Sequence, residues 1–413
     1  MTTSTAPLLA SLSWLDHDAV AAERSMRLMA LFEEKEARDE LGVGGIRDAI
    51  SDQLFPGTST IQTRLRYFLF IPWLFEKLDA RAVTSAKYAG AARNAEAELL
   101  EELLAHEQDV GGIIGSRARG HLKRMPSSVY WSGLEAWGIR DYAGSLQQYL
   151  QDADERRAGL QSARRGTDSA DDHEAHGKAW RSEAIQLRPV SFPQGADMAI
   201  TPDEAAFLLE RWRACHPDSL LTWLALELQD SLSLPHAERI WEHECASRFP
   251  RAIGELIVQA QRLDALVRGA ALLYNLQLAE MDKRDALEKL YSDALDNWAE
   301  GESTLTHGWD LADLWDRVED KGHGITPKTK AFVEAWLQEV KASRKSIRTS
   351  RRARELVYAR ETNLKGASSS RFLNASARKQ WGGAAGLAPM SFRWPTADIY
   401  LREWHAGLRR ENG

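Results

Sequence analysis

Apolar residues recur at three- and four-residue spacing along most of the chain, which is the period of one buried helix face. A long helix is expected at 16–40 and another at 84–106. After residue 200 the same spacing predicts helices at roughly 202–216, 219–230, 234–247, 250–279, 281–298, 308–318 and 327–364. Prolines and a glycine within 187–200 predict a short strand or two. We therefore expect a mainly α, multi-helical fold with at most a few short strands.

One stretch, Arg38–Trp73, combines glycines, charges and hydroxyls more densely than the rest of the chain. A glycine turn at 42–45 precedes a short helix at 46–54, and Phe55-Pro56-Gly57 breaks that helix. Thr58 or Ser59 is then expected to cap a second helix that kinks or ends near Pro72. Two short helices around such a break predict a helix-hairpin-helix or helix-turn-helix-like unit.

A second glycine turn at 111–120 is followed by another proline break, with Pro126 or Ser127 opening the next helix. The polar segment after it, 152–178, lacks an apolar period. We therefore predict an N-terminal helical module with the candidate active site at 1–150, a polar linker or loop at 151–180, and a helical C-terminal body at 181–413.

Composition narrows the class of protein. The chain has 413 residues, of which 44% are hydrophobic, and no apolar run is long enough to cross a membrane. The N-terminus lacks a charged n-region, and there are only two cysteines without a CxxC pair. These features predict a cytoplasmic protein with no membrane partner.

Charge is unevenly distributed. The net charge is −7, yet Lys341–Lys379 contains twelve basic residues and only two acidic ones. This basic segment, which includes Arg351 and Arg352, is either a surface that tracks phosphates or a solvated helical face that pairs with the acidic body. The sequence leaves both possibilities open.

Two carboxylates are the main candidates for chemistry. Asp48 and Asp52 lie four residues apart and would share one helix face, where like charges repel. Either nearby arginines neutralise them, as Arg47, Arg64 and Arg66 could, or a carboxylate serves a basic, hydroxyl-rich site. The sequence leaves these alternatives open.

Glycine turns before helices are candidate phosphate sites, because free N–H groups and the helix dipole favour anions there. The chain has no GxxxxGK[ST] and no complete GxGxxG motif, and its histidine and cysteine spacings do not match a zinc site. We therefore expect no metal and no cofactor. The expected phosphate ligands are Gly42, Gly44, Arg47, Arg64, Arg66, Arg117, Arg119, Lys123, Arg124, Ser127, Arg351 and Arg352.

Aromatic residues accompany both glycine turns and could stack on bases, although most are expected in the core. Tyr67 and Tyr130 are the two that we expect to be exposed, with Trp131 beside them.

Several motifs resemble an uncharacterised bacterial family of about this length. They are WLDHD at 14–18, the whole stretch from Arg38 to Trp73, LKRMPSSVYWSGLEAWGIR at 122–140, and the late LKG, WGG and FRWP. Members of that family occur in phage-defence gene clusters. The resemblance implies antiviral defence, and we expect the family to include an antiphage DNA glycosylase that removes glucosylated hydroxymethylcytosine.

A local resemblance points the same way. Leu41–Gly44 followed by Thr60–Thr63 is similar to the hairpin of helix-hairpin-helix DNA glycosylases, which binds a DNA phosphate and is followed by a catalytic acid. Here that position is Gln62, so the catalytic role shifts to Asp52 or Asp48. Gln62 would then read the modified base together with Thr58, Ser59 and Thr60.

These resemblances imply a metal-independent DNA N-glycosylase. It would flip a modified cytosine out of double-stranded phage DNA and hydrolyse its glycosidic bond, leaving an abasic site. One alternative is a non-catalytic DNA-binding subunit of a multi-gene defence system, with defence proteins as partners. Another is a scaffold whose basic segment docks an acidic protein.

Overall fold

The regular elements are helices. The computed structural model describes residues 39–116, 124–165, 179–319 and 322–410, and within these ranges it contains no strand, only an isolated antiparallel bridge between Arg140 and Trp180. The mainly α expectation is confirmed. The short strands expected at 187–200 are wrong: successive i→i+3 hydrogen bonds, such as Phe192 N–H to the Pro189 carbonyl, close this segment into turns.

The chain divides into two compact units, each built from separate segments. Unit 1 contains the described residues of 1–45, 261–313 and 324–390. Unit 2 contains those of 46–260, 314–323 and 391–413. The two expected boundaries near residues 150 and 180 both fall within unit 2. Of the expected linker, Ala153–Arg165 forms helix α7, and 166–178 lies outside the described residues.

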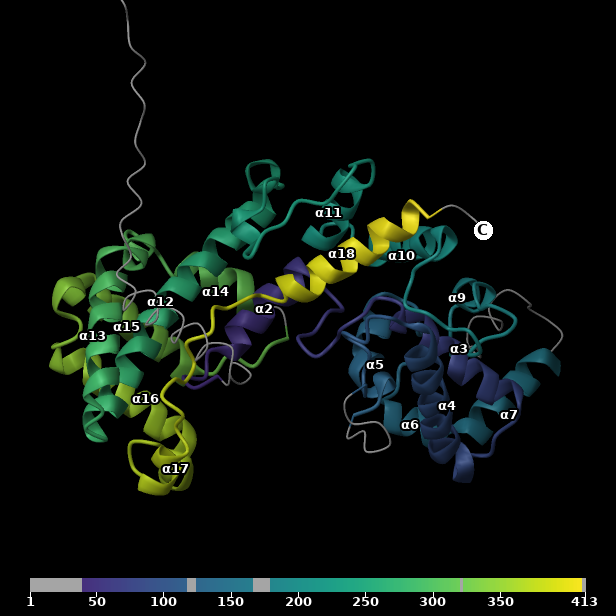
Figure 1. Cartoon of the computed structure of the whole chain (residues 1–413), viewed down its shortest axis with the longest axis horizontal. Coiled ribbons are helices and arrows are strands. Elements are labelled where there is room, and N and C mark those ends of the chain that lie inside the picture. The colour runs from purple at the N-terminus through teal and green to yellow at the C-terminus, as the bar shows by residue number, and fades with distance from the viewer. Residues whose placement is uncertain (1–38, 117–123, 166–178, 320–321, 411–413) are drawn as a thin grey trace, which may run out of the picture. The chain divides into compact units, whose positions relative to one another are not determined.

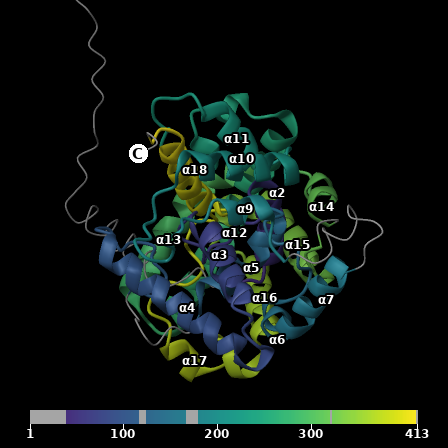
Figure 2. The same cartoon turned by 90° about the vertical axis from the view of Figure 1, so that its right-hand side faces the viewer.

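In unit 2, helix α3 is apolar on nearly all sides and is buried among α4, α5 and α9 (Figure 1). Helices α10, α11 and α18 pack on one another (Figure 2). The helices of this unit are α2 (Gly44–Leu54, from residue 46), α3 (Tyr67–Ala80), α4 (Ser85–His106), α5 (Pro126–Ala136), α6 (Leu146–Gln151), α7 (Ala153–Arg165), α9 (Ser182–Gln186), α10 (Pro202–Cys215), α11 (Leu220–Leu228) and α18 (Trp394–Leu408).

The segment before α3 differs from the prediction. The helix begins at Tyr67, not at Thr58 or Ser59, and it continues through Pro72 to Ala80. Residues 58–66 form a loop because side chains bind their backbone: the Tyr130 hydroxyl accepts hydrogen bonds from the N–H groups of Thr63 and Arg64, and Glu403 accepts one from Leu65. These contacts replace the intrahelical bonds that a helix would need.

Unit 1 is a second helical assembly. Indole N–H groups tie its helices together: Trp298 of α13 donates to the Ala265 carbonyl and Trp336 of α15 to the Leu266 carbonyl, both on α12. Helix α15 packs against α16. The helices are α12 (Arg251–Met281, from residue 261), α13 (Asp285–Glu300), α15 (Pro327–Ser343), α16 (Arg351–Ser369) and α17 (Ala375–Lys379), while α14 (Ala312–Val318) crosses the division.

Two other expected helices are wrong. The helix predicted at 327–364 is interrupted after Ser343, because Ser350 caps a new helix by accepting the Ala353 N–H. The helix predicted at 234–247 is replaced by short 3-10 turns at Ile240–Glu242 and Ala246–Arg248. The helix expected at 16–40 lies almost entirely outside the described residues. Among those residues, no helix combines the length and hydrophobicity needed to span a bilayer.

Candidate functional site

Asp52 lies in the last turn of α2 and is held between two side chains from distant parts of unit 2. One carboxylate oxygen forms an ion pair with Arg393, and the other lies 2.7 Å from Nε2 of His323. The Asp52 side chain remains 40% exposed. Its two partners are less exposed, so the carboxylate is positioned by the protein yet open to solvent.

Asp48 lies one turn earlier on the same helix and extends this group. Arg47 donates to its carboxylate from Nε at 3.0 Å and Nη2 at 2.9 Å, and Nη2 of Arg393 lies 4.0 Å away. We call Asp48, Asp52, Arg393 and His323 the α2 cluster. The two carboxylates do share one helix face, as their spacing predicts, and a cation is supplied between them.

The backbone that delivers Arg393 is strained. Phe392 and Arg393 both have positive φ, at 48° and 64°, although neither is glycine. Each such residue costs roughly 1–3 kcal/mol and persists only where the surroundings enforce it, often at functional sites. Nη1 of Arg393 also donates to the Thr58 carbonyl at 2.8 Å, which fixes the 58–66 loop to the same guanidinium.

Sequence reasoning missed Arg393 and His323. Arg393 belongs to the FRWP motif, whose sequence indicates family resemblance but no chemistry. His323 lies between two glycines, outside any helical pattern of apolar residues. Their proximity to Asp52 is tertiary: each is more than 270 residues away along the chain.

Gln62, by contrast, is buried and fully engaged. Its Oε1 accepts hydrogen bonds from the Ser59 N–H at 2.9 Å and the Tyr400 hydroxyl at 3.1 Å, while Nε2 donates to the Gly57 carbonyl at 3.2 Å. These contacts show a residue that holds the loop together. Both polar atoms of the buried Gln62 side chain therefore bind groups of the protein itself.

The hydroxyl residues beside Gln62 differ in accessibility. Thr58 is buried and donates to the Phe55 carbonyl, whereas Thr60 is exposed. The Ser59 hydroxyl is buried without a hydrogen-bond partner among the described residues. Ile61, in the same loop, is 42% exposed, and other large aliphatic side chains of this unit, such as Val110 and Leu232, are exposed as well.

Of the three arginines expected to neutralise Asp48 and Asp52, Arg47 binds Asp48, whereas Arg64 and Arg66 pair with other carboxylates. Arg64 pairs with Glu403 and donates to the Gly111 carbonyl. Arg66 is buried and pairs with Asp197 at 2.6 Å and with the fully buried Glu204 at 2.8 Å. Their contacts join the loop to distant segments of unit 2.

The first predicted phosphate turn already contains an anion in unit 1. The Asp39 carboxylate accepts hydrogen bonds from the N–H groups of Val43 at 2.8 Å and Gly44 at 2.5 Å. The Gly42 carbonyl accepts one from Arg360. Gly42 has a φ of 68°, and an added Cβ would lie 2.6 Å from the Arg360 guanidinium. Glycine is therefore required here by the positive φ of the turn and by the close approach of the Arg360 guanidinium.

At the second predicted phosphate site, a carboxylate of the protein again occupies the position expected for a phosphate. The N–H and hydroxyl of Ser127, at the start of α5, both donate to Glu96, at 2.7 and 3.1 Å. Burial raises the pKa of Glu96 to about 7. Arg124 is exposed nearby. Arg117, Arg119 and Lys123 lie outside the described residues.

The expectation that Tyr67 and Tyr130 are exposed is wrong. Both are buried, because their hydroxyls serve the backbone: Tyr67 accepts the Ile114 N–H, and Tyr130 also donates to the Arg64 carbonyl. Burial raises the pKa of both phenols. Trp131 is buried too and donates to the Gly144 carbonyl. None of the three is available for stacking in this conformation.

Most of the basic segment is paired with acidic side chains of unit 1. Examples are Arg354 with Glu280, Arg378 with Asp282, and Lys365 and Arg371 with Glu40. Arg351 and Arg352 also have acidic neighbours, Glu355 at 2.7 Å and Glu339 at 3.6 Å, but their side chains are 92% and 69% exposed. These two remain open to a polyanion.

A family model for a family of unknown function, DUF6361, matches residues 9–407. The chain belongs to this family. Neither the comparison with curated proteins nor the comparison with solved structures gives a match. Because the family carries no assigned activity, the expected link to phage defence and to glycosylases stays a prediction.

Proposed function

We propose that this DUF6361 protein is a cytoplasmic, DNA-acting defence enzyme, most concretely a metal-independent DNA N-glycosylase that excises modified bases. The observation that carries the proposal is the α2 cluster, in which a half-exposed Asp52 is oriented by Arg393 and His323. The strained backbone at Phe392 and Arg393 supports a functional role. An ordinary surface ion pair contributes little stability, so the ion pair with Asp52 does not by itself offset the cost of this strain.

The proposed reaction is hydrolysis of the bond between C1′ of deoxyribose and the base. The base leaves with the bonding electrons, and the sugar develops oxocarbenium character that the Asp52 carboxylate would stabilise. A water molecule adds to C1′ and transfers a proton to Asp52 or His323, and this proton then passes to the base that left as an anion. The products are an abasic sugar and the free base.

The loop beside the cluster suits base flipping. Exposed Ile61 supplies an apolar side chain of the kind that wedges into a vacated stack, and exposed Thr60 supplies a hydroxyl. The loop is joined to the cluster through the bond between Arg393 and the Thr58 carbonyl. Under this proposal Ile61 fills the gap while Asp52 acts on the flipped nucleotide.

The substrate is tested directly. Purified protein is incubated at low salt with glucosylated phage DNA and with matched unmodified DNA, and abasic sites are counted. We expect abasic sites on the modified DNA. Their absence from both substrates, with correctly folded protein, contradicts the enzyme proposal.

The exposed Arg351 and Arg352 favour a second candidate, a non-catalytic DNA-binding subunit of a defence system. It predicts DNA binding that falls steeply with salt and no base release. The Asp52→Asn variant separates the two candidates: loss of phage protection with retained DNA binding supports the glycosylase, whereas unchanged protection supports the binding subunit.

A further inference from the structure

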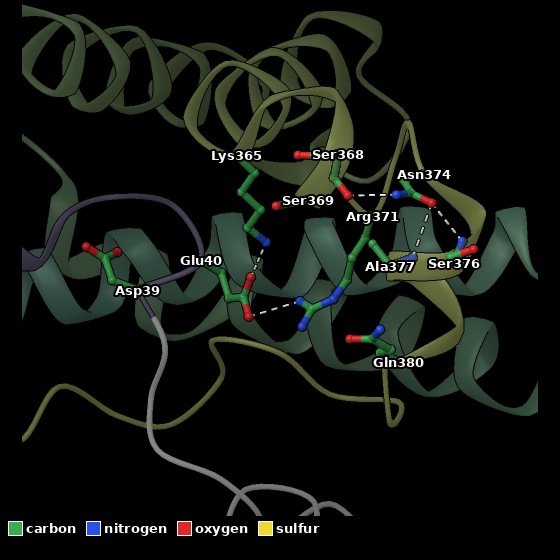
Figure 3. Close-up of a pocket in the computed structure, with 10 residues that line it drawn as sticks. All are labelled: Asp39, Glu40, Lys365, Ser368, Ser369, Arg371, Asn374, Ser376, Ala377 and Gln380. Atoms are coloured by element: carbon green, nitrogen blue, oxygen red, sulfur yellow. Dashed lines mark hydrogen bonds and ion pairs between the residues drawn. The ribbon is translucent and has the colours of Figure 1, made fainter.

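Unit 1 contains a cavity of about 530 Å³ that none of the predicted sites uses. It lies at the C-terminal end of α16 and beside α17, with Asp39 and Glu40 along one side (Figure 3). Its volume falls within the range of small-molecule pockets, and its lining is dominated by polar side chains.

The charged residues of this pocket neutralise one another. Glu40 is buried, and its two carboxylate oxygens pair separately with Lys365 and with Arg371, the latter at 2.9 Å. Lys365 also lies 3.3 Å from the buried Glu361. The Asp39 carboxylate is already bound to backbone N–H groups. Since carboxylates match or outnumber the cations, an anionic ligand would gain little here.

Four neutral side chains around the pocket are uncommitted, which here means that they make no hydrogen bond to other described residues. They are those of Ser368, Ser369, Ser376 and Gln380, all of which are exposed. A hydroxyl or a carboxamide can both donate and accept. The pocket thus offers hydrogen-bond donors and acceptors beside charged side chains that pair with one another.

Asn374 keeps part of this arrangement in place. Its Oδ1 accepts hydrogen bonds from the N–H groups of Ser376 and Ala377, and its Nδ2 donates to the Ser368 carbonyl at 2.6 Å (Figure 3). These bonds connect the start of α17 to the end of α16. They therefore hold the backbone of Ser368 and Ser376, two of the serines that line the pocket.

We propose that this pocket binds a neutral ligand rich in hydroxyl groups, of the monosaccharide class, either free or attached to a larger molecule. Sugar hydroxyls both donate and accept, which matches the four uncommitted side chains, and they carry no charge that would disturb Glu40, Lys365 and Arg371. The inference does not depend on the glycosylase proposal, because it concerns unit 1 and the α2 cluster belongs to unit 2.

Calorimetric titration of the full-length protein tests the proposal. The ligands are D-glucose, D-ribose, inorganic phosphate, a glucosylated DNA duplex and its unmodified counterpart. We expect saturable binding of at least one sugar-bearing ligand and weaker binding of phosphate. Binding of a free monosaccharide identifies a free sugar. Preference for the glucosylated over the unmodified duplex identifies an attached sugar only if the Ser376→Ala/Gln380→Ala variant loses that preference, because the α2 cluster could also favour glucosylated DNA. A preference that this variant keeps contradicts binding at the pocket.

The variant Ser376→Ala/Gln380→Ala is expected to weaken sugar binding at least about tenfold, since it removes two neutral hydrogen-bonding groups. The matched control is Ser346→Ala/Gln338→Ala, which makes the same substitutions at exposed positions of unit 1 outside the pocket. The Asp52→Asn variant should bind the sugar normally even if it abolishes base release. No saturable sugar binding, tighter binding of phosphate, or equal effects of the two double variants overturns the proposal.

Discussion

The end of α2 and the following loop at 58–66 are both rich in polar residues but differ in the contacts that their side chains make. In the loop, Gln62 and Arg66 are buried and every contact made by Gln62 is internal. On α2, Asp48 and Asp52 are 36% and 40% exposed and are held by a strained arginine. A dense polar stretch therefore contains both structural and candidate functional residues, and solvent access with imposed geometry distinguishes them.

The largest expected effect is on the loop side of this comparison. Arg66→Ala should lower the free energy of unfolding by about 3–5 kcal/mol, because it leaves the carboxylate of buried Glu204 without its partner. Urea denaturation measures the change. Arg402→Ala removes an arginine from a more exposed pair with Asp398 and should cost no more than about 1 kcal/mol. Similar losses in both variants would contradict a structural role for Arg66.

Glu96 tests whether the predicted anion position at α5 is structural. The folded-state pKa of about 7 exceeds the ordinary value of 4.5, so the folded protein binds the proton more tightly. The stability that this proton contributes is present below pH 4.5 and is lost as the pH rises through about 7, by roughly 3 kcal/mol in total. Glu96→Gln should remove this loss in urea titrations across the same pH range. An unchanged pH dependence would exclude Glu96 as its source.

Gln62→Ala should destabilise the protein by about 1–3 kcal/mol, because the Ser59 N–H, the Tyr400 hydroxyl and the Gly57 carbonyl lose their partner. Thermal and urea unfolding measure this effect. Thr60→Ala, an exposed change two residues away, should stay within about 0.5 kcal/mol. If the Gln62→Ala protein is as stable as the wild type, Gln62 does not have the structural role assigned to it and is again a candidate functional residue.

The smallest expected effect concerns the backbone of the α2 cluster. Both Arg393→Gly and Arg393→Ala remove the ion pair with Asp52, but only glycine adopts a φ of 64° without strain. The glycine variant should therefore be more stable than the alanine variant by about 0.5–1 kcal/mol. Differential scanning calorimetry compares the two. Equal stability, or a more stable alanine variant, would show that the left-handed conformation is not enforced by the surroundings.

The sequence predicted the parts of the structure that depend on local periodicity. Helices α4, α10, α12 and α13 follow the apolar spacing, and the shared face of Asp48 and Asp52 follows from their separation. It did not predict that Tyr130 and Glu403 would bind the backbone of 63–65 and prevent a helix there. Arg393 and His323 were missed because only the tertiary fold brings them to Asp52. A base-reading role was predicted for Gln62 because the sequence does not show its hydrogen bond with Tyr400, which is equally remote along the chain.

The central claim, that Asp52 is a working carboxylate and not only an ion-paired one, is tested by single-turnover base release from glucosylated DNA. The control is Asp398→Asn, which changes another ion-paired aspartate of unit 2 in the same way. We predict that Asp52→Asn slows base release at least ~100-fold at nearly wild-type stability, while Asp398→Asn stays within about twofold. Base release by Asp52→Asn at the rate of the Asp398→Asn control would contradict the claim.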